Sequence, residues 1–197
     1  MSIFEDGLSK NQANFASLSP LSFLERTKKT FPNHTAIEYK DYKLTYKQAA
    51  SRCDALAHLL KNKNCIFGST IAVMLPNIPV MWECHFGIPM ALGVMNAINT
   101  RLDSNTVNFI LDHGEAKLFI YDSEYSKVIQ KALEGVSNPP ILIEYVDKIA
   151  GNERSNFADL KQCLDYETEI QNFIDKEYEH VLPSDEWNSI ALNYTSG

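Results

Sequence analysis

Residues 69–99 decide the fold class: STIAVMLPNIPVMWECHFGIPMALGVMNAIN. The apolar run over 69–76 ends at a proline, which is typical of a short buried strand. Residues 79–92 form a helical segment, and 94–99 is a second short apolar run. A strand, a helix and a strand in this order predict a right-handed βαβ crossover between parallel strands.

The alternation of short apolar runs and helical segments continues along the chain. A Lys40–Asp41 turn within residues 35–46 predicts a β-hairpin. Thr45 with Gln48 is a capping-box pattern, so a helix is expected to begin there. Further elements are expected as strands over 116–122, 139–146 and 188–194, and as helices over 104–114 and 123–134. We therefore predict an α/β fold with a largely parallel sheet, flanking helices and an N-terminal β-hairpin.

Composition bounds the class of protein. The chain has 197 residues, of which 45% are apolar and 22% charged, as in an ordinary globular domain or one large domain cut short. The net charge is −7, and residues 151–187 carry ten acidic side chains against three basic ones. A basic stripe that could neutralise phosphates along a nucleic acid does not occur, so no nucleic-acid partner is expected.

The cysteines and the N-terminus indicate a compartment. Cys53, Cys65, Cys84 and Cys163 show neither C-x-x-C pairing nor metal-ligand spacing, so they are expected as reduced, mostly buried thiols. The first ten residues have no cationic start and no apolar run. These features predict a cytoplasmic protein.

The weakly charged stretch over residues 64–100 raises the question of a membrane span. Its only charge is Glu83, but prolines, glycines and asparagines divide it into short pieces. In lipid these pieces would leave polar groups unpaired. We expect buried core and no transmembrane segment.

The best candidates for ligand binding are the last three residues, Thr195, Ser196 and Gly197, which follow the expected strand over 188–194. Glycine tolerates a positive φ, so consecutive backbone N–H groups can form an anion-binding nest, to which the hydroxyls add donors. Ligands gather at the carboxyl ends of parallel strands, where this run is expected to lie. The tripeptide alone is unspecific, and no Walker A, dinucleotide or nucleophile-elbow motif occurs.

Two other positions keep alternative readings open. His85 beside Glu83 could act in acid–base chemistry or be a satisfied core or groove histidine. Arg101 could meet an anion or pair with a neighbouring acid such as Asp103. The sequence identifies no catalytic residue and no set of metal ligands.

Five blocks resemble, in order, the opening of the adenylate-forming family, which includes acyl- and aryl-CoA ligases, firefly-type luciferases and peptide-synthetase adenylation domains. The resemblance covers about residues 18–134 and 183–197. Within it, residues 85–107 are most similar to plant-type acyl-activating enzymes and bacterial short- and medium-chain acyl-CoA ligases. The blocks are 20–39, 44–60, 71–102, 112–122 and 185–197.

The resemblance implies a partial large domain of the adenylate-forming fold. Residues 1–17 would be an N-terminal arm, and 18–197 the first part of the AMP-binding domain, cut inside the ATP-phosphate loop. In the family this loop reads Tyr-Thr-Ser-Gly-Thr-Thr-Gly-x-Pro-Lys-Gly, and the chain contains its first four residues. Phosphate contact is implied for Thr195, Ser196 and Gly197, with Tyr194 packed beneath them.

The implied reaction joins a small-molecule carboxylate to coenzyme A. The carboxylate attacks the α-phosphate of Mg-ATP, and the CoA thiol then displaces AMP from the acyl-adenylate. ATP, Mg²⁺ and CoA are therefore the implied cofactors and substrates. The resemblance implies a fatty acid as the carboxylate, and an aromatic acid is the alternative. A non-catalytic truncated α/β binding module is the rival from another class.

The family's later parts do not occur in this sequence. They are the loop lysine, the adenine-stacking aromatic block, the ribose-binding aspartate, the magnesium glutamate and the C-terminal domain with its catalytic lysine. We therefore expect that this chain alone is inactive. Its oligomeric state is not readable from the sequence.

Overall fold

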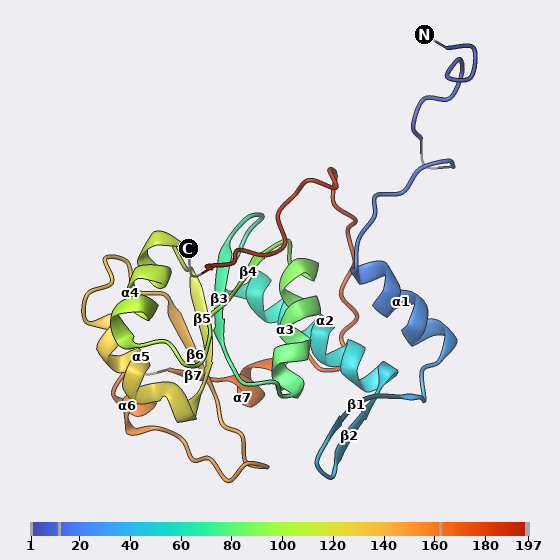
Figure 1. The fold of residues 1–197 in the computed structure, drawn as a ribbon. Coiled ribbons are helices and arrows are strands. Elements are labelled where there is room, and N and C mark those ends of the chain that lie inside the picture. Colours follow the sequence, from blue (N-terminus) through green and yellow to red (C-terminus); the bar gives the residue numbers. More distant parts are fainter. Residues whose placement is uncertain (1, 12, 162, 196–197) are drawn as a thin grey trace.

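The computed structural model describes residues 2–11, 13–161 and 163–195. Its centre is a five-stranded sheet in the order β4-β3-β5-β6-β7, with every neighbouring pair parallel (Figure 1). The strands are β3 (Thr70–Met74), β4 (Val94–Ala97), β5 (Leu118–Asp122), β6 (Ile141–Tyr145) and β7 (Leu164–Asp165). The predicted α/β class with a largely parallel sheet is confirmed.

The predicted hairpin and the helix after it are also confirmed. β1 (Thr35–Tyr39) and β2 (Tyr42–Thr45) pair antiparallel, and Lys40 in the turn has a φ of 51°. The Thr45 hydroxyl accepts a hydrogen bond from Gln48 N–H, and the Gln48 side chain accepts one from Thr45 N–H. This capping box satisfies two backbone donors at the start of α2 (Tyr46–Asn62).

Helices cover both faces of the sheet (Figure 1). Alternation along β3 sorts the side chains, because Ile71 and Val73 pack in one core cluster and Ala72 and Met74 in the other. Each buried side chain of leucine size contributes about 1.5–3 kcal/mol. The first cluster includes residues of α1 (Leu21–Thr30), α2, α3 (Pro79–Met90) and α7 (Tyr166–Gln171). The second includes residues of α4 (Ser104–His113), α5 (Ser126–Leu133) and α6 (Asn156–Leu160).

Helices α2 and α3 approach each other closely at a glycine. A Cβ on Gly87 would lie 2.8 Å from Leu56 Cδ2 and 2.9 Å from Leu56 Cβ, closer than real Cβ contacts allow. The absence of a side chain at Gly87 therefore fixes the spacing of the two helices.

Several elements differ from the sequence prediction. Helix α1 was not expected, and the acidic stretch contains the short strand β7 as well as helices. The helix expected over 123–134 is divided: Ser123–Tyr125 form a 3₁₀ turn, and α5 follows it. The expected strand over 188–194 is wrong in its extent, because only Ala191 bridges to the sheet.

The N-terminal arm lies apart from the rest of the chain in Figure 1. Ile3, Phe4 and Leu8 are more than half exposed there. At the base of the arm, Leu18 N–H donates to Glu186 Oε1 at 2.7 Å. Among the described residues, no helix combines the length and the apolar character that a membrane crossing requires.

Candidate functional site

Residues 188–195 run along the outer edge of β4, and they lead to the expected phosphate-binding residues. Met95 N–H donates to the carbonyl oxygen of Ile190 at 3.0 Å, and Leu192 N–H donates to that of Met95 at 2.9 Å. These two bonds flank the parallel bridge between Met95 and Ala191. In Figure 1 the red C-terminal segment passes β4 toward α4. The segment is thus attached to the sheet over a very short length.

A buried amide adds a third bond to this attachment. Asn96 in β4 is fully buried, and its Nδ2 donates to the carbonyl oxygen of Leu192 at 2.8 Å. Within the described part of the chain, its Oδ1 is buried without a hydrogen-bond partner. Leaving a buried acceptor unpaired costs about 1–3 kcal/mol, so an amide is an expensive side chain at this position.

Tyr194 anchors the segment to α4. Its hydroxyl oxygen lies 2.8 Å from Nδ1 of His113, the last residue of that helix. The His113 ring stacks on Phe109, with ring centroids 5.1 Å apart. Burial raises the pKa of the Tyr194 hydroxyl.

Gly114 leaves room for this contact. A Cβ there would lie 3.3 Å from the Tyr194 hydroxyl and 3.4 Å from Leu192 Cδ2. It would also lie 2.7 Å from the carbonyl oxygen of Ile110, so the helix end would have to move. Gly114 is the C-cap of α4, with a φ of −79°. The positive φ of 48° belongs to Glu115.

Of the expected phosphate-binding residues, Thr195 is described and exposed. Ser196 and Gly197 lie outside the described residues. Their assignment to the ATP phosphates therefore stays a prediction. The structure shows how the chain is held immediately before them.

Glu83 lies in a buried polar network rather than beside His85. Its carboxylate accepts from Arg52 Nε at 2.5 Å and from the Tyr166 hydroxyl at 2.8 Å. Arg52 also binds both carboxylate oxygens of Glu167, at 2.6 and 3.0 Å. Burial raises the pKa of Glu83, and the charge of Arg52 opposes that shift. This network joins α2, α3 and α7.

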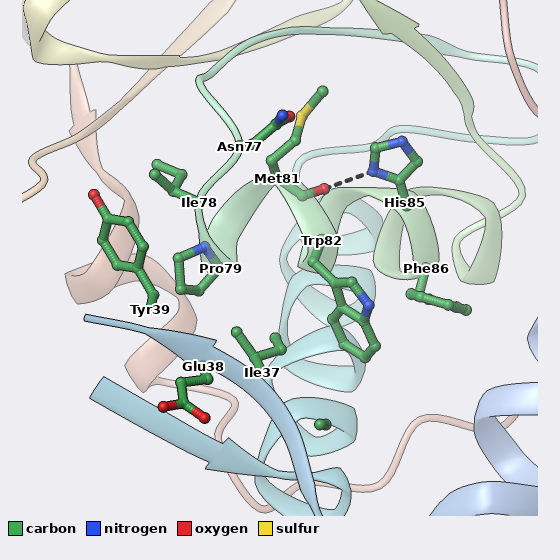
Figure 2. A pocket seen from close by; sticks show the side chains of 11 residues that line it. Ile37, Glu38, Tyr39, Asn77, Ile78, Pro79, Met81, Trp82, His85 and Phe86 are labelled. Carbon is green, nitrogen blue, oxygen red and sulfur yellow. Dashed lines mark hydrogen bonds between the residues drawn. The ribbon is translucent and has the colours of Figure 1, made fainter. Parts of the chain in front are cut away.

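His85 lies in a groove between β1 and α3, here called the hairpin groove (Figure 2). The groove has a volume of about 620 Å³, and Trp82 and Phe86 line it with ring centroids 4.6 Å apart. His85 Nδ1 lies 2.8 Å from the carbonyl oxygen of Met81 on the same helix. The interpretation of His85 as a groove histidine is therefore the one that the geometry favours.

Arg101 and Asp103 each make a local hydrogen bond just before or at the start of α4. Asp103 caps α4, and its Oδ1 accepts from the backbone N–H groups of Asn105 and Thr106 at 2.8 and 3.0 Å. These bonds lower the pKa of Asp103, and the bond from the Thr106 N–H has the largest effect. The backbone N–H of Arg101 donates to Asn99 Oδ1. Asp103 is therefore the N-cap of α4.

Two buried aspartates lie at the carboxyl ends of β5 and β6. Asp122 Oδ1 accepts from Asn152 Nδ2 at 2.9 Å, and burial raises the pKa of Asp122. Asp147 accepts from the Tyr39 hydroxyl at 2.7 Å, and this bond raises the pKa of Tyr39 to about 12. The Tyr39–Asp147 bond ties the hairpin to the sheet.

Mg²⁺ requires oxygen ligands, so the acidic groupings bear on a metal site. In the described residues, one grouping has metal-ligand spacing: Glu25, Asp54 and His180. Lys28 Nζ lies 3.0 Å from Glu25 and 3.5 Å from Asp54, so an ammonium group already supplies positive charge there. This grouping therefore does not fit Mg²⁺.

Comparison with known proteins decides the family. The family described as AMP-binding enzyme matches residues 24–197. The chain belongs to this family. The resemblance to adenylate-forming enzymes is therefore confirmed. The matched range includes all the residues of the candidate site, from Met95 in β4 to Thr195.

Relatives in the AMP-binding family are named as CoA ligases. The chain is 35% identical to acetate–CoA ligase CCL3 of Humulus lupulus, over 98% of this chain and 35% of the relative. It is 36% identical to a peroxisomal trans-cinnamate:CoA ligase of Petunia hybrida, with the same coverage. The chain therefore spans about a third of the length of these relatives.

The solved structures confirm the fold. Anthranilate CoA ligase AuaEII, in complex with anthranoyl-AMP, superposes with a TM-score of 0.79 at 18% sequence identity. The superposition covers 95% of this chain and 34% of that one. The predicted partial domain of the adenylate-forming fold thus agrees with the architecture of this enzyme.

Proposed function

We propose that the chain is the N-terminal portion of an ATP-dependent acid–thiol ligase. A carboxylate oxygen attacks the α-phosphorus of ATP, and the bond to pyrophosphate breaks. The CoA thiol then attacks the acyl carbonyl and releases AMP, leaving a thioester. The observation that carries this proposal is the family match over residues 24–197, together with relatives named as CoA ligases.

The proposed role of this chain is to bind the ATP phosphates at Thr195, Ser196 and Gly197. Backbone N–H groups and hydroxyls would donate hydrogen bonds to phosphate oxygens, which gain charge as pyrophosphate leaves. Mg²⁺ would neutralise further charge on the phosphates, and the glutamate that the resemblance implies for it is not in this sequence. Residues 190–194 would carry the loop into place from the edge of β4.

The proposed carboxylate is an aliphatic, fatty-type acid, and the alternative is an aromatic acid. Relatives with similar sequence identity to this chain are named as CoA ligases of acetate, of acetate or butyrate, and of trans-cinnamate. The proposed compartment is the cytoplasm, with the peroxisome as the alternative because two of these three relatives are named peroxisomal.

The 197-residue chain alone is proposed to be inactive. Removing one donor to a developing oxyanion typically lowers the rate by about 10²–10³. The loop lysine, the magnesium ligand and the catalytic lysine that the resemblance implies are all missing from this sequence. Their combined loss would leave no measurable adenylation.

The test compares two proteins in one assay. The natural protein is isolated from its source with antibodies raised against this chain, and the 197-residue chain is purified in parallel. Each receives Mg-ATP, CoA and one acid from a panel of acetate, butyrate, benzoate and trans-cinnamate. We expect pyrophosphate and a CoA thioester from the natural protein with an aliphatic acid, and neither product from the chain alone.

Each arm can contradict one part of the proposal. A natural protein that forms no thioester with any acid would contradict the ligase function. Preference for benzoate or trans-cinnamate would replace the aliphatic acid with the aromatic one. Carboxylate-dependent release of pyrophosphate by the chain alone would contradict its proposed inactivity.

A further inference from the structure

We propose that Asn96 and His113 are positioning residues for the phosphate-binding loop. They would hold residues 190–194 against β4 and α4, and so set where Thr195 leaves the edge of the sheet. The importance of this positioning for catalysis rests on the proposed function, in which residues 195–197 bind the ATP phosphates. The attachment itself can be tested without any activity.

Burial of the Asn96 amide is energetically costly. The side chain is fully buried within β4, where its neighbours in the sheet are apolar. Its Oδ1 is buried and has no partner in the described residues, which opposes folding. Nδ2 makes the bond to the Leu192 carbonyl, at 2.8 Å. Binding the loop segment is therefore the role that the structure offers for an amide at this place.

His113 contacts the segment beyond its last hydrogen bond to β4. Bonds to β4 end at Leu192, and beyond it the segment is held by the side chain of Tyr194. His113 meets that hydroxyl at 2.8 Å, with its ring oriented by stacking on Phe109. Strand β4 and helix α4 thus both bind the chain shortly before Thr195, through Asn96 and His113. A loop that must place donors against phosphate oxygens needs such a fixed origin.

The bonds have an expected energetic scale. A single hydrogen bond contributes about 0.5–1.5 kcal/mol net, which corresponds to an equilibrium change of up to about tenfold. Local opening of an edge segment is controlled by such bonds and not by the global stability. Loss of one anchor should therefore loosen residues 188–195 while leaving β3 and β5 protected.

Hydrogen exchange of the 197-residue chain, followed by mass spectrometry, tests this inference. The variants are Asn96→Ala, His113→Ala and Tyr194→Phe, and we expect each to speed exchange of the peptide 188–195 by up to about tenfold. His113→Asn keeps a polar atom near the position of Nδ1 and should restore slow exchange. Tyr39→Phe removes a hydroxyl bond far from the segment and serves as the matched control.

The outcomes separate positioning from general stability. Faster exchange confined to 188–195, with an unchanged urea midpoint and rescue by His113→Asn, would support the inference. Unchanged exchange of this peptide in both Tyr194→Phe and His113→Ala would overturn it. Equal acceleration in peptides of β3 and β5 would also overturn it, because the residues would then stabilise the whole fold. None of these results depends on ligase activity.

Discussion

The network around Glu83 and the segment 188–195 are held in opposite ways. Glu83 is fully buried and receives bonds from α2 and α7, so several elements depend on it at once. The hydrogen bonds described above attach the segment to one strand and one helix end, and Trp187 just before it is 92% exposed. The body of the domain is therefore expected to be stable independently of the segment that leads to the loop.

This difference indicates separate roles for the two regions, stability for the Glu83 network and loop placement for residues 188–195. Loops that bind ligands come from the less stable parts of a fold, whereas buried cores resist opening. The Glu83 network and the α2–α3 contact would maintain the sheet. The anchors at Asn96 and His113 would regulate only the approach to Thr195. Substitutions in the Glu83 network should thus lower the stability of the domain, whereas substitutions of Asn96 or His113 should change the position of the loop.

Glu83→Ala should have the largest effect on the body. The change leaves Arg52 with Glu167 alone and leaves the Tyr166 hydroxyl buried without its acceptor. Removing one partner of a buried pair destabilises by about 3 kcal/mol or more. Urea unfolding followed by circular dichroism would measure the loss.

The matched control for that experiment is Glu38→Ala. Glu38 pairs with Lys43 at 2.9 Å, but both side chains are more than half exposed. Such a pair contributes about 0–1 kcal/mol. If Glu38→Ala cost as much as Glu83→Ala, burial would not be what makes the Glu83 network important.

Gly87→Ala should have the next largest effect. The added methyl group would overlap Leu56, so α2 and α3 would have to separate. Overpacking of this kind costs about 1–3 kcal/mol. Gly135→Ala is the control, because the nearest atom to its Cβ would be the side-chain nitrogen of Asn108, at 3.1 Å. A thermal midpoint that falls no further for Gly87→Ala than for Gly135→Ala would argue against a tight helix contact.

Tyr39→Phe should have a smaller effect that depends on pH. The lost bond to Asp147 should cost about 1 kcal/mol at neutral pH. The pKa of Tyr39 is raised from 10.0 to about 12 in the folded protein, so the stabilisation is fully present below pH 10. It is lost as the pH rises toward about 12. The gap in unfolding free energy between wild type and Tyr39→Phe should therefore narrow from pH 8 to pH 11.

A double-mutant cycle sharpens this third prediction. Tyr39→Phe removes the donating hydroxyl, and Asp147→Asn replaces its carboxylate acceptor with a neutral amide oxygen, so each should weaken the interaction. Because the two residues are in direct contact, their effects should not add. Additive losses of free energy would show that the hairpin is held to the sheet by other contacts.

Local patterns predicted the body of the fold well. Apolar runs marked β3 and β5, and the Thr45–Gln48 spacing marked the start of α2, because these signals depend on neighbouring residues. Strand β7 was missed, since it is two residues long and lies among acidic side chains. The strand over 188–194 was overextended because the contact of Tyr194 with His113 cannot be read from local periodicity.

The candidate site shows the same limit. Thr195, Ser196 and Gly197 were identified from a motif, which is local. Asn96 and His113 were not assigned to the site, because their partners lie 96 and 81 residues away. A signal for Asn96 was present: an amide inside the apolar run VMNAIN needs a partner when it is buried. For His113 the sequence offered no comparable signal.

The most direct test of the central claim is a nuclear magnetic resonance titration of the 197-residue chain with Mg-ATP, with Mg²⁺ plus adenosine as the control. We predict that ATP shifts the backbone amide signals of Thr195, Ser196 and Gly197, with smaller changes at Tyr194, and that adenosine does not. Amide shifts confined to the hairpin groove around Trp82, or an equal response to adenosine, would contradict phosphate binding at residues 195–197.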